Sequence, residues 1–141
     1  MPPATPGYSG KPLVEKLGFK SGFHIALIAG PPGFPAALGK LPDDVKIEGA
    51  RANDLDAILF FADRAATLEQ QMPRAIARLT QAGMLWIAWP KKASKLESDL
   101  DFDAVQRVGL DAGLVDNKSC AIDEDWQAVR FVYRKVDRPT V

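Results

Sequence analysis

The sequence predicts an α/β protein in which a mostly parallel sheet ends in an antiparallel hairpin. Short continuous apolar runs, typical of strands buried on both faces of a sheet, alternate along the chain with segments of helical periodicity. Near the end of the chain, two strand-like segments are separated only by Asp123–Asp125, a connection short enough for a hairpin. The alternation indicates parallel pairing, and the hairpin adds an antiparallel edge.

The length of 141 residues fits one domain. We expect a single α/β domain over residues 13–136, an extended arm over residues 1–12 and a loose tail over residues 137–141. The arm is expected because the start of the chain is rich in proline, glycine and serine. A hydrophobic content of 47% and a charged content of 26% indicate a folded globular protein rather than a disordered one.

Glycines and prolines divide the first half of the chain into short elements. Pro12 suits the first turn of a short helix, and Gly18 suits its end. The expected elements are, in order, a helix at Pro12–Leu17, a strand at His24–Ala29, a turn-rich loop at Gly30–Pro35, helical turns at Ala36–Leu41 and a short strand at Val45–Glu48.

A strand at Asp56–Asp63 is followed by an amphipathic helix. Thr67–Gln70 resembles a capping box, which places the start of the helix at Thr67. Pro73 should kink this helix or begin a second one, and Gly83 suits its end. The apolar stripe of the helix consists of Leu68, Met72, Ile76 and Leu79.

A buried strand is expected at Met84–Trp89, ended by Pro90. Within it, Trp86 and Trp89 are three residues apart, so their side chains should point to opposite faces of the sheet.

After a polar loop, Asp101 can cap a helix that runs to Ala112. We expect Gly113 to end this helix. Its inward side chains are expected to be Phe102, Val105 and Val108. The two hairpin strands are expected at Val115–Ile122 and Trp126–Lys135.

Residue counts argue against several classes of function. Lysine plus arginine and aspartate plus glutamate both number 18, so the overall charge offers no argument for a nucleic acid or membrane partner. Cys120 is the only cysteine and His24 the only histidine, which removes most of the raw material for a metal site or a catalytic triad. We expect Cys120 to be a small buried hydrophobe and His24 to be structural.

The chain has no pattern typical of export or membrane insertion. Its start has neither a basic segment nor an apolar segment of the kind found in signal peptides. Its apolar runs are far shorter than the roughly 20 residues needed to span a bilayer. A cytoplasmic, metal-free protein is therefore expected.

The loop formed by Gly30, Pro31, Pro32 and Gly33 is one candidate site. It follows the first expected strand, and open α/β sheets bind ligands at the carboxyl ends of their strands. Each proline lacks an N–H, so the loop offers few backbone donors. It is either a rigid cradle for a small molecule or anion, or a tight turn packed under the N-terminal arm.

Polar residues follow two other strands of the same sheet. Lys91, Lys92 and Ser94 combine cations with a hydroxyl, a set that suits a phosphate or carboxylate. The alternative is a solvated polar loop. Asp63 can act as a base or hydrogen-bond acceptor, or it can cap the next turn, and we favour the cap.

From Leu13 onward, the order of elements resembles the class I methyltransferase fold, a three-layer Rossmann-like architecture. Asp56–Ala62 resembles its fourth strand, and Gln81–Ile87 is similar to the pattern of a glycine before its fifth strand. The closing hairpin resembles its last two strands. The interval between Gly30 and Asp56 is too short for two strand–helix units, so the resemblance implies a reduced version with one strand missing.

This resemblance implies S-adenosylmethionine as a cofactor, held by a glycine-rich turn after the first strand and an acidic residue closing the second. Here the turn reads AGPPGF over Ala29–Phe34, with no acidic residue before it. Glu48 stands at the second position. Only half of the cofactor site carries over.

Three motifs resemble an uncharacterised bacterial family, a domain of unknown function. They are GYSGKPL at Gly7–Leu13, the Pro31–Gly33 loop and WPKKAS at Trp89–Ser94. The family implies a fold and a bacterial cytoplasmic setting but no activity.

Three functions follow from these observations. The first is a protein on a degenerate methyltransferase-like fold that binds an anionic small molecule between the Gly30–Gly33 loop and Lys91–Ser94. The second is a minimal S-adenosylmethionine-dependent methyltransferase. The third is a non-enzymatic interaction module that docks another protein or a second copy through its arm and edge hairpin.

Overall fold

The computed structural model describes residues 12–34, 38–49 and 52–134. The elements are α1 (Leu13–Lys16), β1 (His24–Ile28), β2 (Lys46–Ile47), β3 (Leu55–Phe61), α3 (Ala65–Ala77), β4 (Leu79–Pro90), α4 (Phe102–Asp111), β5 (Leu114–Ala121) and β6 (Trp126–Tyr133). Most of the expected arm, the whole tail and residues 36–37 of the helical turns expected at Ala36–Leu41 lie outside the described residues. Residues 38–41, the described part of those turns, are not helical.

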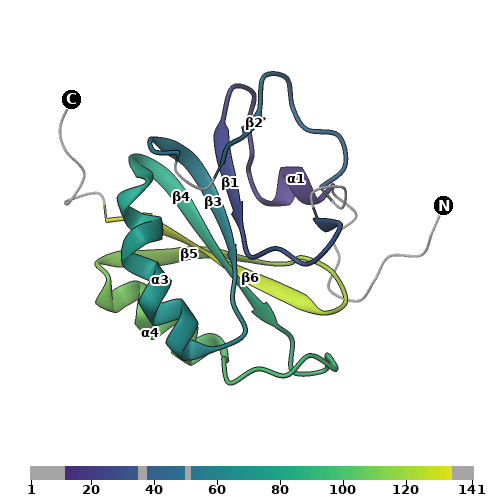
Figure 1. Ribbon diagram of the computed structural model, residues 1–141, viewed down its shortest axis with the longest axis vertical. Helices are drawn as coiled ribbons and strands as arrows, with labels where there is room; N and C mark the ends of the chain where they lie inside the picture. The colour runs from purple at the N-terminus through teal and green to yellow at the C-terminus, as the bar shows by residue number, and fades with distance from the viewer. Residues whose placement is uncertain (1–11, 35–37, 50–51, 135–141) are drawn as a thin grey trace.

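The described strands form one sheet of six, in the order β2-β1-β3-β4-β6-β5. β2, β1, β3 and β4 run parallel, whereas β6 is antiparallel to both β4 and β5. Figure 1 shows α3 and α4 side by side against the sheet, with α1 in the layer on its other side. The mostly parallel sheet with an antiparallel closing hairpin is confirmed. Among the described residues between β1 and β3, the one strand is the two-residue β2, in keeping with a reduced fold.

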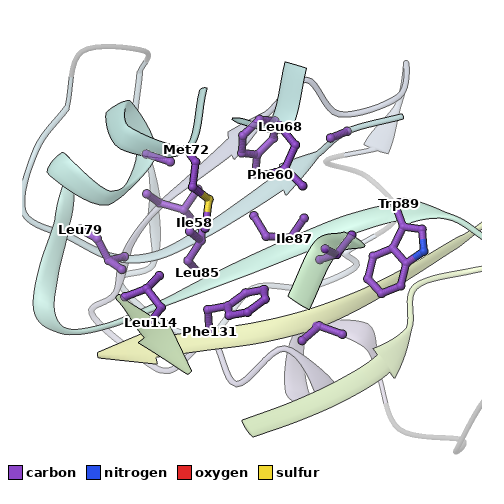
Figure 2. Close-up of a cluster of buried hydrophobic side chains, with 14 of the residues drawn as sticks. Ile58, Phe60, Leu68, Met72, Leu79, Leu85, Ile87, Trp89, Leu114 and Phe131 are labelled. Atoms are coloured by element: carbon purple, nitrogen blue, oxygen red, sulfur yellow. The ribbon is translucent and has the colours of Figure 1, made fainter. Parts of the chain in front are cut away.

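The core has two layers because the central strand β4 is buried on both faces. Trp86 packs with α1 on one face, and Trp89 packs in the layer of α3 and α4 on the other. The predicted opposition of these two side chains is therefore confirmed. Figure 2 shows the second layer, where Leu68 and Met72 of α3 lie over the sheet and Phe131 lies in the same cluster.

Two side-chain hydrogen bonds between residues far apart in the sequence hold α1 against the sheet. The indole Nε1 of Trp86 donates a hydrogen bond to the carbonyl of Leu17 at 2.9 Å. Lys16 is only 7% exposed, and its Nζ donates to the carbonyl of Ala121 at 2.7 Å. A buried ammonium requires such partners, because an unpaired charge would lose its hydration without compensation. The short helix is thus tied to both β4 and the end of β5.

The predicted capping box at Thr67 is wrong, because α3 already begins at Ala65. Its N-cap residue, Arg64, makes no side-chain capping bond. The capping acceptor is instead Asp99 Oδ1, which accepts from the Ala65 N–H at 2.7 Å across 34 residues of sequence. A long-range contact therefore moves the helix start away from the local signal.

Gly83 does not end a helix, which is a second correction. It lies inside β4, where the register shifts from Leu55 opposite Leu79 to Ala57 opposite Met84. A Cβ at Gly83 would lie 2.8 Å from Leu79 Cγ and 3.0 Å from the Leu55 carbonyl oxygen. The glycine is required by this close approach at an irregularity in the strand, and not by a left-handed turn.

Two related expectations are also corrected in this region. Pro73 lies inside the single helix α3, so no second helix begins there. Leu79, expected on the helical stripe, is the first residue of β4.

Local signals predict α4 and α1 well. Asp101 Oδ1 accepts from the Ala104 N–H at 2.8 Å, so it caps α4 as expected. Gly18 and Gly113 follow the two helices with φ values of +76° and +92°, the left-handed conformation typical of helix ends.

Gly109 of α4 should not tolerate alanine. A Cβ there would overlap Phe131 Cε1 of β6. Glycine to alanine normally favours a helix by about 1 kcal/mol. We expect the opposite sign here, with Gly109→Ala destabilising by about 1–3 kcal/mol in urea unfolding because the core is overpacked. Arg107→Ala, an exposed change in the same helix, should stay within about 0.5 kcal/mol of wild type. An increase in stability for Gly109→Ala would contradict this packing.

Candidate functional site

The parallel strands β2, β1, β3 and β4 bring their carboxyl ends to one edge of the sheet. Each sequence-predicted candidate follows one of these strands. The loop at Gly30–Gly33 follows β1, Glu48 follows β2, Asp63 follows β3, and Lys91, Lys92 and Ser94 follow β4. The structure divides them among separate environments.

The Pro-Pro-Gly loop forms a tight turn. The Phe34 N–H donates to the Pro31 carbonyl at 3.0 Å, and Gly33 has φ +76°, the arrangement of a type II turn with proline at its second position. Beneath it, the rings of Phe34 and Phe61 pack edge to face with centroids 4.7 Å apart. Phe34 and Phe61 belong to the core layer of α1. The loop is therefore packed on the α1 face of the sheet.

Glu48 lies beside the amino-terminal part of β1. Its N–H donates to the carbonyl of Ile25, at the amino end of β1, at 2.8 Å. Its Oε2 lies 3.2 Å from His24 Nδ1, a contact that becomes an ion pair when the imidazole is protonated. Glu48 also lines a cavity of about 360 Å³ with Ala29 and residues of α3. His24 thus has a partner, the carboxylate of a candidate residue.

Asp63 lies exposed at the end of β3. The capping alternative is wrong, because Asp99 supplies the capping oxygen of α3. The Asp63 carbonyl accepts from the Asp99 N–H at 3.3 Å. Its side chain lines a small cavity of about 200 Å³ with Pro90 and Trp126.

Lys91 and Lys92 line a cavity of about 610 Å³ at this edge. Its wall continues through Trp89 at the end of β4 and Ser98 in the following loop to Phe102 at the start of α4. Trp89 belongs to the core layer of α3 and α4, so this cavity lies on the face opposite α1. None of the four residues Gly30–Gly33 lines it. The structure does not bring the loop and the lysines into this one cavity.

Ser94 holds the loop rather than lining this cavity. Its Oγ lies 2.9 Å from Asp125 Oδ1 and accepts from the Leu96 N–H at 3.1 Å. The Lys91 N–H donates to the Asp125 carbonyl at 2.8 Å. These bonds attach the start of the loop to the hairpin turn, and Asp99 attaches its end to α3. The segment that carries the lysines is therefore fixed at both ends.

Both signs of charge line the cavity. Asp101 and Asp103 line the cavity together with the two lysines. Asp101 uses Oδ1 to cap α4, whereas Asp103 is exposed in the first turn of the helix. An anion near the lysines is thus attracted by two cations and repelled by two carboxylates, so its position relative to each charge decides the balance.

The sequence pattern misses two residues of this cavity. Phe102 was expected to face inward, but it is 43% exposed and its ring lies beside Trp89, with centroids 6.4 Å apart. The reason is its place as the first residue of α4, where the helix projects past the packed core. Gln127 also lines the cavity. The available signal was a polar residue between Trp126 and Ala128 in a mostly apolar strand.

Cys120 is partly buried and packs against the core layer of α1. Burial raises the pKa of its thiol, and the positive charge of Lys16 opposes that shift. A raised pKa leaves less reactive thiolate near neutral pH. Among the described residues, no three histidine, cysteine, aspartate or glutamate side chains are grouped so that they could hold a metal ion. No helix in this part of the chain is long and apolar enough to cross a membrane.

The family model described as "Protein of unknown function (DUF3052)" matches residues 42–135, two thirds of the sequence. The chain belongs to this family. The expected membership of an uncharacterised family is therefore confirmed. The match includes Trp89–Ser94 and begins after the Pro-Pro-Gly loop of this DUF3052 member. A search of curated proteins finds no significant match.

Solved structures support the fold of this DUF3052 protein. A fibrillarin pre-rRNA processing protein of Methanococcus jannaschii aligns with TM-score 0.58 and 11% identity over 87% of this chain and 69% of its own. An Aeropyrum pernix fibrillarin with natively bound S-adenosyl-L-methionine aligns with TM-score 0.56 and 13% identity, over 89% of this chain and 70% of its own. A SAM-dependent methyltransferase from Aquifex aeolicus aligns with TM-score 0.56 and 13% identity, over 84% of this chain and 86% of its own. The methyltransferase-like fold is confirmed. At these identities the likeness concerns the fold alone.

Asp99 should stabilise both α3 and the loop after β4. Asp99→Ala removes the capping oxygen of Ala65, so we expect a loss of about 0.5–2 kcal/mol in the free energy of unfolding. Glu97→Ala is the matched control in the same loop, because the Glu97 side chain is 91% exposed and lies 3.8 Å from Arg64. Its effect should be close to zero. Equal losses for the two variants in urea unfolding would argue against the long-range cap.

Proposed function

We propose that this protein binds an anionic small molecule at the carboxyl end of β4, on a reduced methyltransferase-like fold in the bacterial cytoplasm. The observation that supports this most is the cavity of about 610 Å³ lined by Lys91 and Lys92. Cavities of this size typically hold small molecules. Two ammonium groups suit a phosphate or carboxylate, since each acts as a point charge with several donors.

The fixed loop supports the proposal further. The Lys91 backbone is bonded to Asp125, and Asp99 joins the same loop to α3. Positioning two lysines on an anchored segment lowers the entropy lost when a ligand orders them.

Binding of S-adenosylmethionine fits these residues poorly. The loop after β1 offers few backbone N–H groups to a ligand. Pro31 and Pro32 have no N–H, and the N–H of Phe34 is used in the bond that closes the turn. Glu48, which the resemblance assigns to the ribose, contacts His24 and lies level with Ile25. We therefore derive no methyl-transfer step for this chain. A binding experiment with this cofactor decides the matter directly.

The test is a thermal-shift titration with ribose 5-phosphate, S-adenosylmethionine and buffer alone. One-site binding stabilises a protein by about 2.7 kcal/mol at a hundredfold excess over Kd, so a ligand should raise the Tm by several degrees. We expect a shift with ribose 5-phosphate and none with S-adenosylmethionine. The double variant Lys91→Ala, Lys92→Ala should weaken the phosphate at least about tenfold. Lys95→Ala is the control, because Lys95 is in the same loop but does not line the cavity.

Asp103→Asn should act in the opposite direction. It removes one of the two like charges from the cavity wall while keeping the shape of the side chain. We expect ribose 5-phosphate to bind about two- to fivefold more tightly to this variant, with the gain reduced by added salt. An unchanged or weaker affinity for Asp103→Asn, or full binding by the double lysine variant, would overturn this location for the anion.

A further inference from the structure

We infer that the ligand is a planar aromatic anion whose ring packs on Phe102 while its charged group lies near Lys91 and Lys92. The inference rests on the proposed function and names the class of molecule that this cavity selects. It is carried by the wall between two neighbouring cavities.

The cavity at Lys91 and Lys92 does not stand alone. A second cavity of about 440 Å³ lies next to it over β5 and β6, lined in part by Ser119, Ala121 and Val129. The two cavities have four residues in common, namely Trp89, Lys91, Phe102 and Gln127. Together they form a continuous groove that is charged at one end and lined by small or apolar side chains at the other.

Phe102 stands at the junction of the groove. Its ring is tilted by 51° against that of Trp89, which is 2% exposed and supports it from the core. Phe102 itself is 43% exposed. The apolar surface that it leaves in contact with water is unfavourable, and packing inside the domain does not cover it. An aromatic side chain backed by a buried ring is a firm surface on which a flat molecule can stack.

Gln127 adds a polar group at the same place. Within the described part of the chain its side-chain amide makes no hydrogen bond, although it lines both cavities. The amide presents two donors and an acceptor in one plane. That arrangement suits the hydrogen-bonding edge of a heteroaromatic ring lying against Phe102.

The charges of the groove fit the same orientation. Lys91 and Lys92 attract an anionic group to the cavity at the loop. Asp101 and Asp103 line that cavity too but are absent from the walls of the one over β5 and β6, where Lys91 is the charged residue. A nucleoside monophosphate combines an anion, a short sugar and a flat ring with a polar edge, and therefore matches both ends.

The test compares two ligands that share a phosphate and differ by the ring. Adenosine 5′-monophosphate and ribose 5-phosphate are titrated calorimetrically into wild type, Phe102→Ala, Phe102→Leu and Phe102→Tyr. Leu110→Ala is the matched control, because Leu110 is 40% exposed on the same helix and does not line the groove. We expect wild type to bind the nucleotide at least about fivefold more tightly than ribose 5-phosphate.

Phe102→Ala and Phe102→Leu should lose this preference without a change for ribose 5-phosphate, whereas Phe102→Tyr and Leu110→Ala should keep it. Phe102→Leu retains an apolar side chain, so it distinguishes loss of the ring from a general disturbance of α4. Equal affinities of wild type for the two ligands, or a preference that survives Phe102→Leu, would overturn the inference and leave the proposed function standing. Failure of both ligands to bind would overturn the proposed function as well.

Discussion

The fold depends on β4, a central strand that is buried on both faces. β4 pairs with β3 in parallel and with β6 in antiparallel register, so the direction of the sheet reverses on its far side. Its two tryptophans fill opposite layers: Trp86 binds the end of α1, and Trp89 closes the layer beneath α3 and α4. A strand in this position cannot shift by one residue, because the shift would exchange the two layers. The loop that leaves β4 therefore emerges at a fixed point, and the candidate cavity forms there.

The same constraint explains why two clusters suggested by the sequence do not share the cavity at Lys91. Both the Pro-Pro-Gly turn and the lysines follow parallel strands, so both reach the carboxyl edge of the sheet. Beyond the edge, however, each chain segment turns toward one layer. Phe34 packs in the layer of α1, so the turn lies on that face. Leu100 packs in the layer of α3 and α4, and Phe102 lines the cavity beside it, so the loop after β4 lies on the other face. Position along a strand predicts the edge but not the face.

Signals contained within a few residues predicted most of the fold. The alternation of strands and helices, the cap at Asp101 and the hairpin at Asp123–Asp125 all act locally, and all are present. The errors arise where distant segments meet. Thr67 was expected to cap α3, but the capping acceptor comes from the loop after β4. Gly83 was expected to end the helix, but it allows a close approach between strands. The exposure of Phe102 depends on how far α4 extends beyond the sheet, which no periodicity records. Charge alone suggested Lys91 and Lys92 as candidates, whereas no local signal suggested that Phe102 lines the same cavity.

The bond between Asp99 and Ala65 makes the first turn of α3 dependent on the order of the loop after β4. The helix is capped only when the chain has crossed the sheet through β4 and the following loop is in place. In the native protein, each opening of that loop releases the Ala65 amide to solvent. The rate of hydrogen exchange at this one amide therefore reports the motion of the loop, at a position outside the candidate cavity.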